Sequence, residues 1–239
     1  MLICSKLQII FLRNRPLRIL AFFFIIAFTT MSISNAADSY FMTFNMGATP
    51  LMTTVFMWLG TIPAFIFLPM VPAIKRKIGK NGMFRMFLGI AITAMLLMYL
   101  LMSIPSLKEW TTLLFVMQFI KSTGVVVATG YMWALVPEVV TYSEFASGRR
   151  VAGIVNALIC IFMKAGMALG GVIPGLVLAW VGFKAGESVQ TPIAEQGILW
   201  LVTLIPAILF VLAIYVIGKY ELTDAKMDEI NAAVTNKTK

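Results

Sequence analysis

Two lysines stand within long apolar stretches, where a charge is energetically unfavourable. Lys164 lies in the run CIFMKAGMALGG, residues 160–171, and Lys121 lies in a second apolar run. A lysine at a bilayer centre costs about 2.5–3.5 kcal/mol on insertion scales, so it normally faces a cavity or a partner. At about 1.5 Å per residue, Lys164 lies roughly 20 Å of helix beyond Val151, too deep for its side chain to reach the interface. We therefore expect both lysines to serve polar sites.

The helical neighbours of Lys164 indicate a side that faces the interior of a bundle. Asn156 lies two turns earlier, and the residues that share the side are small, namely Ala157, Cys160, Ala168 and Gly171. Two G-x-x-x-G pairs follow, and such pairs allow helices to approach closely. They are Gly166 with Gly170 and Gly171 with Gly175.

The stretch before this helix, PEVVTYSEFASGRRVAG from Pro137, concentrates charges of both signs. Glu138 and Glu144 are negative, whereas Arg149 and Arg150 are positive. One interpretation is a solvated loop that helps to set membrane orientation. The other is a charge-pair latch that closes one side of a transporter. Spacing alone does not choose between them.

The sequence contains few of the residue combinations that enzymatic catalysis uses. Histidine is absent, and the two cysteines, Cys4 and Cys160, lie far apart, so neither a metal site nor a Cys-His nucleophile is indicated. No G-x-x-x-x-G-K-[ST] phosphate loop is present. We predict a protein that is not an enzyme, has no resident cofactor, and relies on a gradient or another subunit for any transport.

The elements that must position these residues are membrane helices. The 239 residues are 60% hydrophobic and 12% charged, whereas a soluble domain is about 25% charged. Spans need about 20 apolar residues, and the sequence predicts one all-α integral membrane domain, 1–239, with a tail at 219–239. Its six expected spans are approximately 17–42, 51–74, 83–105, 111–137, 151–182 and 196–218.

The distribution of Lys and Arg predicts the orientation. Most of the 19 basic residues flank the spans on the side that carries both termini, which places both termini in the cytoplasm. We therefore attribute the net charge of +9 to basic residues that set the membrane orientation rather than to nucleic-acid binding. A competing interpretation is a cleaved signal peptide ending at Ala36, but the region before the apolar run is long. In the tail, one helical face collects Leu222, Met227, Ile230 and Val234, which favours a surface helix over a partner-binding segment.

The residues from Pro137 to Gly153, followed by FMKAGMALGG, resemble the loop and eleventh helix of the glycoside-pentoside-hexuronide:cation symporters. These are sugar transporters of the major facilitator superfamily. NRPLRIL from Asn14 resembles the start of the family's seventh helix, and YELTDAKMDEI from Tyr220 resembles its tail. Lys164 falls where the family has a mid-membrane lysine, and the loop matches are Glu138, Tyr142, Glu144, Gly148 and Arg150.

The match departs from the family pattern in two ways. Thr141 replaces a usual acid, and Ser143 and Ser147 replace the usual Gly and Thr. More importantly, the resemblance covers only the second half of a twelve-helix fold. The ten acids of this chain are expected at span ends, in loops or in the tail, with Asp38 and Glu138 closest to hydrocarbon. By the resemblance, Lys164 pairs with an acid of the absent half.

The resemblance implies the carboxy-terminal half of a sugar:cation symporter in a bacterial inner membrane, not competent for transport alone. The coupling cation, Na⁺ or H⁺, would bind only with an amino-terminal half as partner. The expected substrate or coupling residues are Lys164, Lys121, Asn156 and Thr129, and the expected gate is Glu138, Tyr142, Glu144, Arg149 and Arg150. The alternatives are a non-transporting assembly partner, a truncated remnant, or a half that associates with itself.

Overall fold

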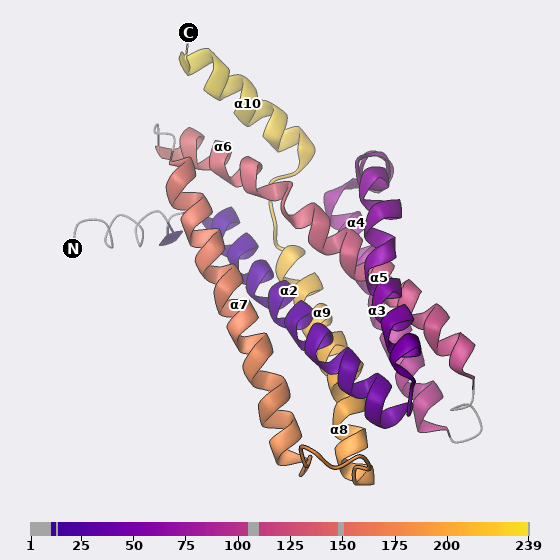
Figure 1. Ribbon diagram of the computed structural model, residues 1–239. Helices are drawn as coiled ribbons and strands as arrows, with labels where there is room; N and C mark the ends of the chain where they lie inside the picture. The colour runs from indigo at the N-terminus through magenta and orange to yellow at the C-terminus, as the bar shows by residue number, and fades with distance from the viewer. Residues whose placement is uncertain (1–10, 13, 105–109, 148–150, 239) are drawn as a thin grey trace, which may run out of the picture.

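The computed structural model describes residues 11–12, 14–104, 110–147 and 151–238, and the regular elements in these ranges are all helices. Figure 1 shows a bundle of long tilted helices with α10 projecting from one end. The elements are α2 (Arg15–Tyr40), η1 (Phe41–Asn45), α3 (Pro50–Phe67), η2 (Leu68–Met70), α4 (Val71–Ser103), α5 (Thr111–Met132), α6 (Leu135–Ser147), α7 (Ala152–Trp180), α8 (Pro192–Val202), α9 (Leu204–Ile217) and α10 (Asp224–Thr238).

Three helices begin with the same local signal, a polar cap followed by proline. Asn14 caps α2, Thr49 caps α3 and Thr191 caps α8, each accepting a hydrogen bond from a backbone N–H in the first turn. Proline is favoured at this point because its missing N–H would lack a helical partner anyway. Asn14 also donates from Nδ2 to Ser143 Oγ at 2.6 Å, which ties the start of α2 to α6.

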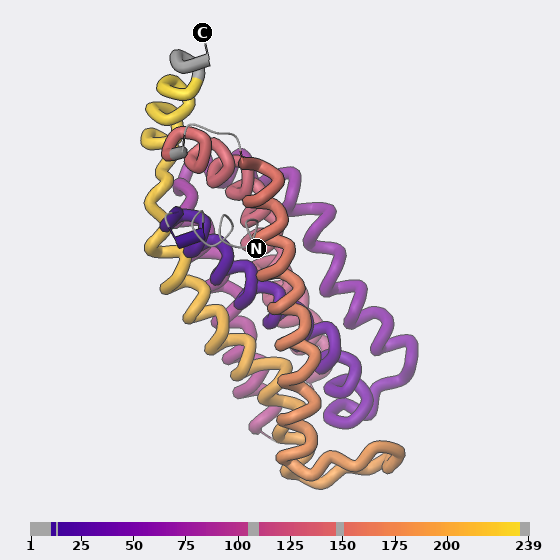
Figure 2. Tube along the Cα trace, turned by 90° about the vertical axis from the view of Figure 1, so that its left-hand side faces the viewer, coloured from indigo at the N-terminus to yellow at the C-terminus, as the bar shows by residue number. Residues whose placement is uncertain are grey.

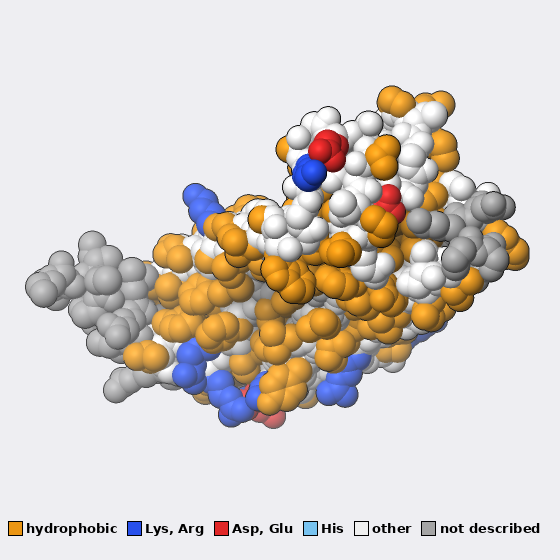
Figure 3. All heavy atoms as spheres, turned by 90° about the horizontal axis from the view of Figure 1, so that it is seen from below, with side chains coloured by type: hydrophobic (Ala, Val, Ile, Leu, Met, Phe, Trp, Pro, Cys, Tyr) orange, Lys and Arg blue, Asp and Glu red, His pale blue; other side chains and the backbone are white. Residues whose placement is uncertain are grey.

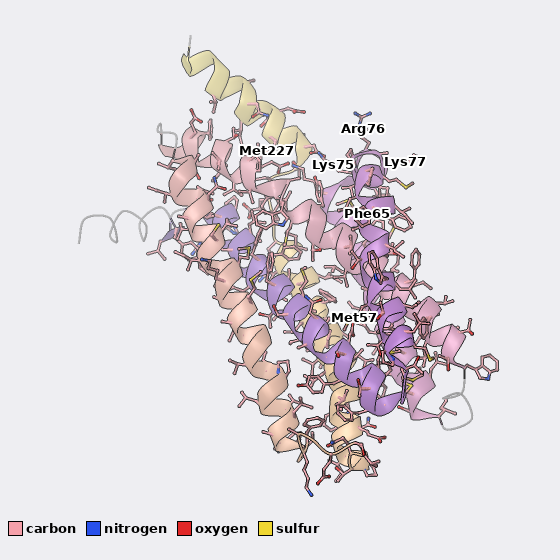
Figure 4. All side chains as sticks on the ribbon, in the orientation of Figure 1. Met57, Phe65, Lys75, Arg76, Lys77 and Met227 are labelled. Atoms are coloured by element: carbon pink, nitrogen blue, oxygen red, sulfur yellow. The ribbon has the colours of Figure 1, made fainter. Side chains whose placement is uncertain are left out.

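The stretch from Pro50 to Ser103 is helical throughout except at Gly79, where the chain reverses direction. Gly79 has φ 71° and ψ 170°, which a side chain would disfavour. A straight helix of 54 residues would be about 80 Å long, far more than a bilayer needs. Figure 1 shows the chain turning back here, and Figure 4 places Lys75, Arg76 and Lys77 at this turn.

Five helical stretches among the described residues are long and apolar enough to cross a membrane. The Pro50–Ser103 stretch is one of the five and contains the reversal at Gly79. The predicted loop after Pro137 is wrong, because α6 continues as a helix to Ser147. The buried side of α6 carries Val136, Val139 and Val140, at the spacing of one helical face.

Glycines allow close contacts between helices. A Cβ on Gly166 would lie 2.6 Å from the backbone oxygen of Ile25, and one on Gly170 would lie 2.5 Å from that of Thr29. The predicted close approach is thus confirmed for this pair, and the helix it contacts is α2. Gly171 and Gly175 have nothing within 4 Å of such a Cβ, so the second pair makes no close contact with other described residues.

Figure 1 shows α7 along one side of the bundle, and Figure 2 shows α3 along another. Only Phe56 and Pro63 of α3 are buried. Figure 3 shows hydrophobic side chains covering much of the side seen from below, with charged side chains sparse and gathered toward its edges. A surface of this kind requires lipid or protein against it.

Candidate functional site

A buried ion pair joins α5 to α2. Lys121 Nζ lies 3.2 Å from Asp38 Oδ1 and 3.5 Å from Asp38 Oδ2. One turn before Lys121, the Gln118 side chain donates from Nε2 to Asp38 Oδ2 at 3.2 Å. Only 3% of Lys121 and 9% of Asp38 are exposed, so each charge depends on the other in place of water.

The pair borders a cavity of about 350 Å³ between α2, α3 and α5. Met57, labelled in Figure 4, lies on α3 at the edge of this space. The wall combines apolar side chains with hydroxyls and amides. Its residues are Met31, Ser34, Asn35, Asp38, Met57, Gly60, Thr61, Gln118, Lys121, Ser122, Val125 and Val126. The structure thus places Lys121 at the wall of a cavity.

Asp38 lies near the end of a span, as expected, because α2 ends at Tyr40. Sequence reasoning did not predict that Asp38 is buried there and pairs with Lys121. A sequence signal was available, because the polar residues Ser34, Asn35 and Asp38 are spaced by one and three residues, which puts them on one helical face toward the cavity. The π-helix η1 begins shortly after Asp38, a feature often found at functional sites.

Lys164 does not lie inside the bundle that this chain forms. It is exposed on α7, on a different side of the helix from Gly166 and Gly170, which pack on α2. The predicted interior position is therefore wrong for this chain alone, since its small neighbours Ala157 and Cys160 are exposed as well. The depth of Lys164 along α7 still makes lipid a poor environment for it.

Two further predicted residues make local hydrogen bonds. The Thr129 side chain is buried, and its Oγ1 donates to the Val125 carbonyl of its own helix at 2.8 Å. Asn156 is exposed on α7 and donates from Nδ2 to the Ala152 carbonyl at 3.0 Å. The structure does not bring either of them to the cavity around Asp38.

A second charge network joins three segments at the α10 end of the bundle. Lys80 Nζ lies 2.6 Å from Glu138 Oε1 on α6 and 3.1 Å from Asp224 Oδ1 at the start of α10. It also donates to the Leu222 carbonyl at 3.1 Å. Lys75 reaches the same Asp224 oxygen at 2.7 Å. Lys80 is 6% exposed, so this one ammonium connects α4, α6 and the tail.

The surroundings in this network shift the pKa values of two tail residues, Tyr220 and Asp224. Burial raises the pKa of the Tyr220 hydroxyl, and the negative charge of Glu138 adds to the effect. The Tyr220 hydroxyl therefore stays protonated and donates a hydrogen bond to Glu138 Oε2 at 3.5 Å. Burial alone would also raise the pKa of Asp224, but hydrogen bonds from Lys75 and Lys80, with their charges, outweigh it and lower that pKa.

The predicted gate is only partly visible. Glu138 pairs with Lys80, a residue that sequence reasoning assigned only to topology, whereas Arg149 and Arg150 lie outside the described residues. Glu144 borders a shallow hollow that Asn156 also lines. Tyr142 is half-buried against the core.

The amphipathic tail is confirmed as a surface helix lying against the protein. Leu222, Met227 and Ile230 are buried, and Val234 packs on the same core. Figure 4 shows Met227 at the base of α10, near the Lys75 turn. The described residues include no group of three or more His, Cys, Asp or Glu side chains placed to hold a metal ion.

Comparison with known proteins gives these features a context. Residues 6–224 match the model of a family described as MFS/sugar transport protein. The chain belongs to this family. MFS/sugar transport proteins are membrane transporters, so the resemblance found at the Glu138–Arg150 stretch and at Lys164 is confirmed at the level of the family.

Several relatives of the chain carry the names of symporters or carriers. The chain is 38% identical over 226 residues to the uncharacterized symporter YnaJ of Bacillus subtilis (strain 168), covering 95% of this chain and 47% of the relative. It is 30% identical to the glucuronide carrier protein homolog of Escherichia coli (strain K12), covering 95% and 48%. A further E. coli relative, YagG, is named as a glycoside/cation symporter and is 28% identical, covering 92% and 46%.

The chain therefore spans about half the length of the curated relatives it matches. Family membership and the long apolar helices among the described residues together make it a multi-pass membrane protein.

Proposed function

We propose that this chain is the carboxy-terminal, six-helix half of a sugar:cation symporter for glycosides, pentosides or hexuronides. Family membership and half-length coverage of named symporters support the proposal. Among the described residues, the reversal at Gly79 divides Pro50–Ser103 into two segments that are each long enough to span, which supports a proposed total of six spans.

An even number of spans puts both ends on one membrane side. The structure supports this, because Arg15 at the start of α2 pairs with Glu221 in the tail at 2.6 Å. The excess of Lys and Arg at the same end favours the cytoplasm, and the proposed location is a bacterial inner membrane.

The observation that carries the proposal is the uncovered face of α7. Of its 29 residues, seven are buried, and the exposed ones include Lys164 with small residues around it. An ammonium at mid-span among small side chains suits a protein partner better than lipid. We assign that partner to a separate amino-terminal half, which would supply an acid to Lys164 and most of the cation site.

In such a transporter, the two halves would rock against each other around a midplane site. Lys164 and Lys121 would face that site, with Asn156 and Thr129 in supporting positions. At the cytoplasmic end, Glu138, Tyr142, Glu144, Arg149 and Arg150 would form the inner gate, to which the structure adds Lys80. No resident cofactor is needed, because a Na⁺ or H⁺ gradient would drive uptake.

Uptake by reconstituted vesicles tests this function. Vesicles with this chain alone are compared with vesicles that also contain the amino-terminal half of YnaJ, using labelled glycosides and an imposed Na⁺ or H⁺ gradient. We expect gradient-driven uptake only with both halves. Uptake by the chain alone would show that it is competent by itself, whereas uptake by neither preparation would favour a non-transporting assembly partner or a remnant.

A further inference from the structure

An open apolar groove of about 410 Å³ lies between α4 and α5. The side chains at its two ends on α4, Met86 and Leu97, are 41% and 43% exposed. The polar side chain in its wall, Thr93, donates from Oγ1 to the Gly89 carbonyl at 2.9 Å, so its hydroxyl is already satisfied. From α5 the wall receives Met117 and Ile120. The groove therefore suits a hydrocarbon chain better than a polar ligand, and the flexible methionines can adapt to such a chain.

The groove has the length of one bilayer leaflet. Met86 and Leu97 are eleven positions apart in α4, which is about 16 Å of helix. Half of a hydrocarbon core of about 30 Å is about 15 Å. Gly89 leaves space along this path, because a Cβ there would meet nothing within 4 Å. One acyl chain of a lipid can thus lie along the whole groove.

The Met86 end of the groove lies at the level of a lipid headgroup. Arg85 precedes Met86, and its Nη2 lies 3.5 Å from where a Cβ on Gly218, at the end of α9, would be. Beside Gly218, Lys219 Nζ donates to the Tyr215 hydroxyl at 2.8 Å and lies 4.1 Å from its ring centroid. Tyrosine rings and the ammonium ends of lysines concentrate at the membrane–water interface. A phospholipid with a chain in the groove would therefore have its phosphate beside Arg85.

The charges available at this end are positive. Arg85 is exposed and has no carboxylate partner among the described residues. The tail acids Glu221 and Asp224 are already paired with other basic residues. Arg76 and Lys77, labelled at the nearby turn in Figure 4, are exposed as well. A guanidinium can bind phosphate through two parallel hydrogen bonds, and surrounding cations favour a headgroup with net negative charge.

The groove is also on a side of the bundle that lipid can reach. Figure 1 shows α7 on one side of the bundle and α4 with α5 toward the opposite side. The face that we assign to an amino-terminal half is that of α7. Lipid is therefore the occupant that the surroundings of α4 and α5 supply in a membrane.

We propose that the groove between α4 and α5, together with Arg85, binds an anionic phospholipid such as phosphatidylglycerol. One acyl chain lies along α4 from Met86 to Leu97, and the phosphate accepts hydrogen bonds from the Arg85 guanidinium. The assignment to the cytoplasmic leaflet rests on the orientation given under the proposed function. The groove, its length and the unpaired guanidinium do not depend on that function.

Two substitutions separate the chain contact from the headgroup contact. Gly89→Leu fills the groove, and leucine is a better helix former than glycine. Arg85→Gln removes the charge at the headgroup end. The matched controls are Gly171→Leu on α7, where a Cβ likewise meets nothing within 4 Å, and Lys226→Gln, an exposed cation on α10.

Binding is measured by native mass spectrometry of the full chain in detergent. The probes are phosphatidylglycerol and phosphatidylcholine with the same acyl chains. We expect phosphatidylglycerol to bind about fivefold or more tightly than phosphatidylcholine, and Arg85→Gln to remove most of this preference. Gly89→Leu should weaken binding of both lipids by about threefold or more, because the chain loses its packing contacts. Both controls should stay within about twofold of the parent.

Equal binding of the two lipids to the parent would overturn the proposal. So would parent-like binding by Arg85→Gln or by Gly89→Leu, and so would an equal loss in Lys226→Gln, which would indicate attraction by diffuse surface charge. Circular dichroism checks that each variant is folded, and Arg85→Gln carries the test if Gly89→Leu does not fold. Since the experiment contains neither a sugar nor an ion gradient, its failure would leave the symporter assignment unaffected.

Discussion

Asp38 on α2 and Lys121 on α5 are 83 positions apart in the chain, and their charged atoms meet at 3.2 Å inside the bundle. Removing one member should be worse than removing both, because a single substitution leaves a buried charge alone. We expect Asp38→Asn to destabilise the chain by about 3 kcal/mol. The double variant Asp38→Asn with Lys121→Met should recover much of that loss.

Unfolding of both variants in detergent, followed by tryptophan fluorescence, measures this coupling. Equal destabilisation by the single and double variants would show that the pair contributes nothing as a pair. Lys219→Met, at the exposed Lys219–Tyr215 contact, is a lysine control and should change little.

The contact between α7 and α2 should depend on one glycine pair and not on its neighbour. Gly170→Ala would force a Cβ against the Thr29 backbone and the Ser32 side chain, whereas Gly171→Ala meets nothing within 4 Å. Overpacking of this kind costs about 1–3 kcal/mol, while alanine at an open helical site is neutral or slightly favourable. The measurement is the free energy of unfolding of the two variants, and similar values for both would refute the packing shown by the structure.

Lys80 should hold the tail in place. Lys80→Met removes the cation that Glu138, Asp224 and the Leu222 carbonyl share, so α10 should dock less tightly. Hydrogen exchange of α10 should accelerate by about tenfold, equivalent to about 1.4 kcal/mol. Lys77→Met, on an exposed residue of the same turn, is the matched control. An unchanged exchange rate in Lys80→Met would mean that apolar packing alone docks the tail.

Tail docking should also weaken in acid. The pKa of Asp224 is lower in the folded protein than its ordinary value of 3.8, so its ion pairs stabilise the docked tail above that value. This stabilisation is lost as pH falls through the lowered folded pKa. Fluorescence anisotropy of a label at Ala232→Cys, in a chain with both native cysteines replaced, should drop over this range. In Asp224→Asn that drop should be absent, and an identical profile would exclude Asp224 as its origin.

The membrane class and three of the helix starts depend on local signals that the sequence carries. Thr49 and Thr191 directly precede a proline, and Asn14 lies two positions before one. A polar cap followed by proline is typical of a helix start. The partner of Lys121 was not predictable in this way, since no local rule pairs it with Asp38 on another helix. A loop was predicted in place of α6 because the prediction gave more weight to its charged residues than to the helical spacing of Val136, Val139 and Val140.

Lys164 illustrates a different limit. Small neighbours predict a helix contact but do not identify the partner. Gly166 and Gly170 contact α2 within the chain, whereas the side with Lys164 and Cys160 is exposed. On the proposed function, that side meets the amino-terminal half. Lys164→Ala in a two-half complex should then lower gradient-driven uptake by about tenfold or more, and unchanged uptake and assembly would remove Lys164 from the mechanism.

The position of Cys160 allows the most direct test of the half-symporter assignment. Cys160 is exposed on α7 one turn before Lys164, and a benzophenone maleimide attached to it, with Cys4 replaced by Ser, reports what covers this face. The measurement is photo-crosslinking in membranes that contain this chain and the amino-terminal half of YnaJ, with adducts identified by mass spectrometry. The account predicts a covalent adduct between the two halves. Adducts with lipid alone, or with a second copy of this chain, would contradict it.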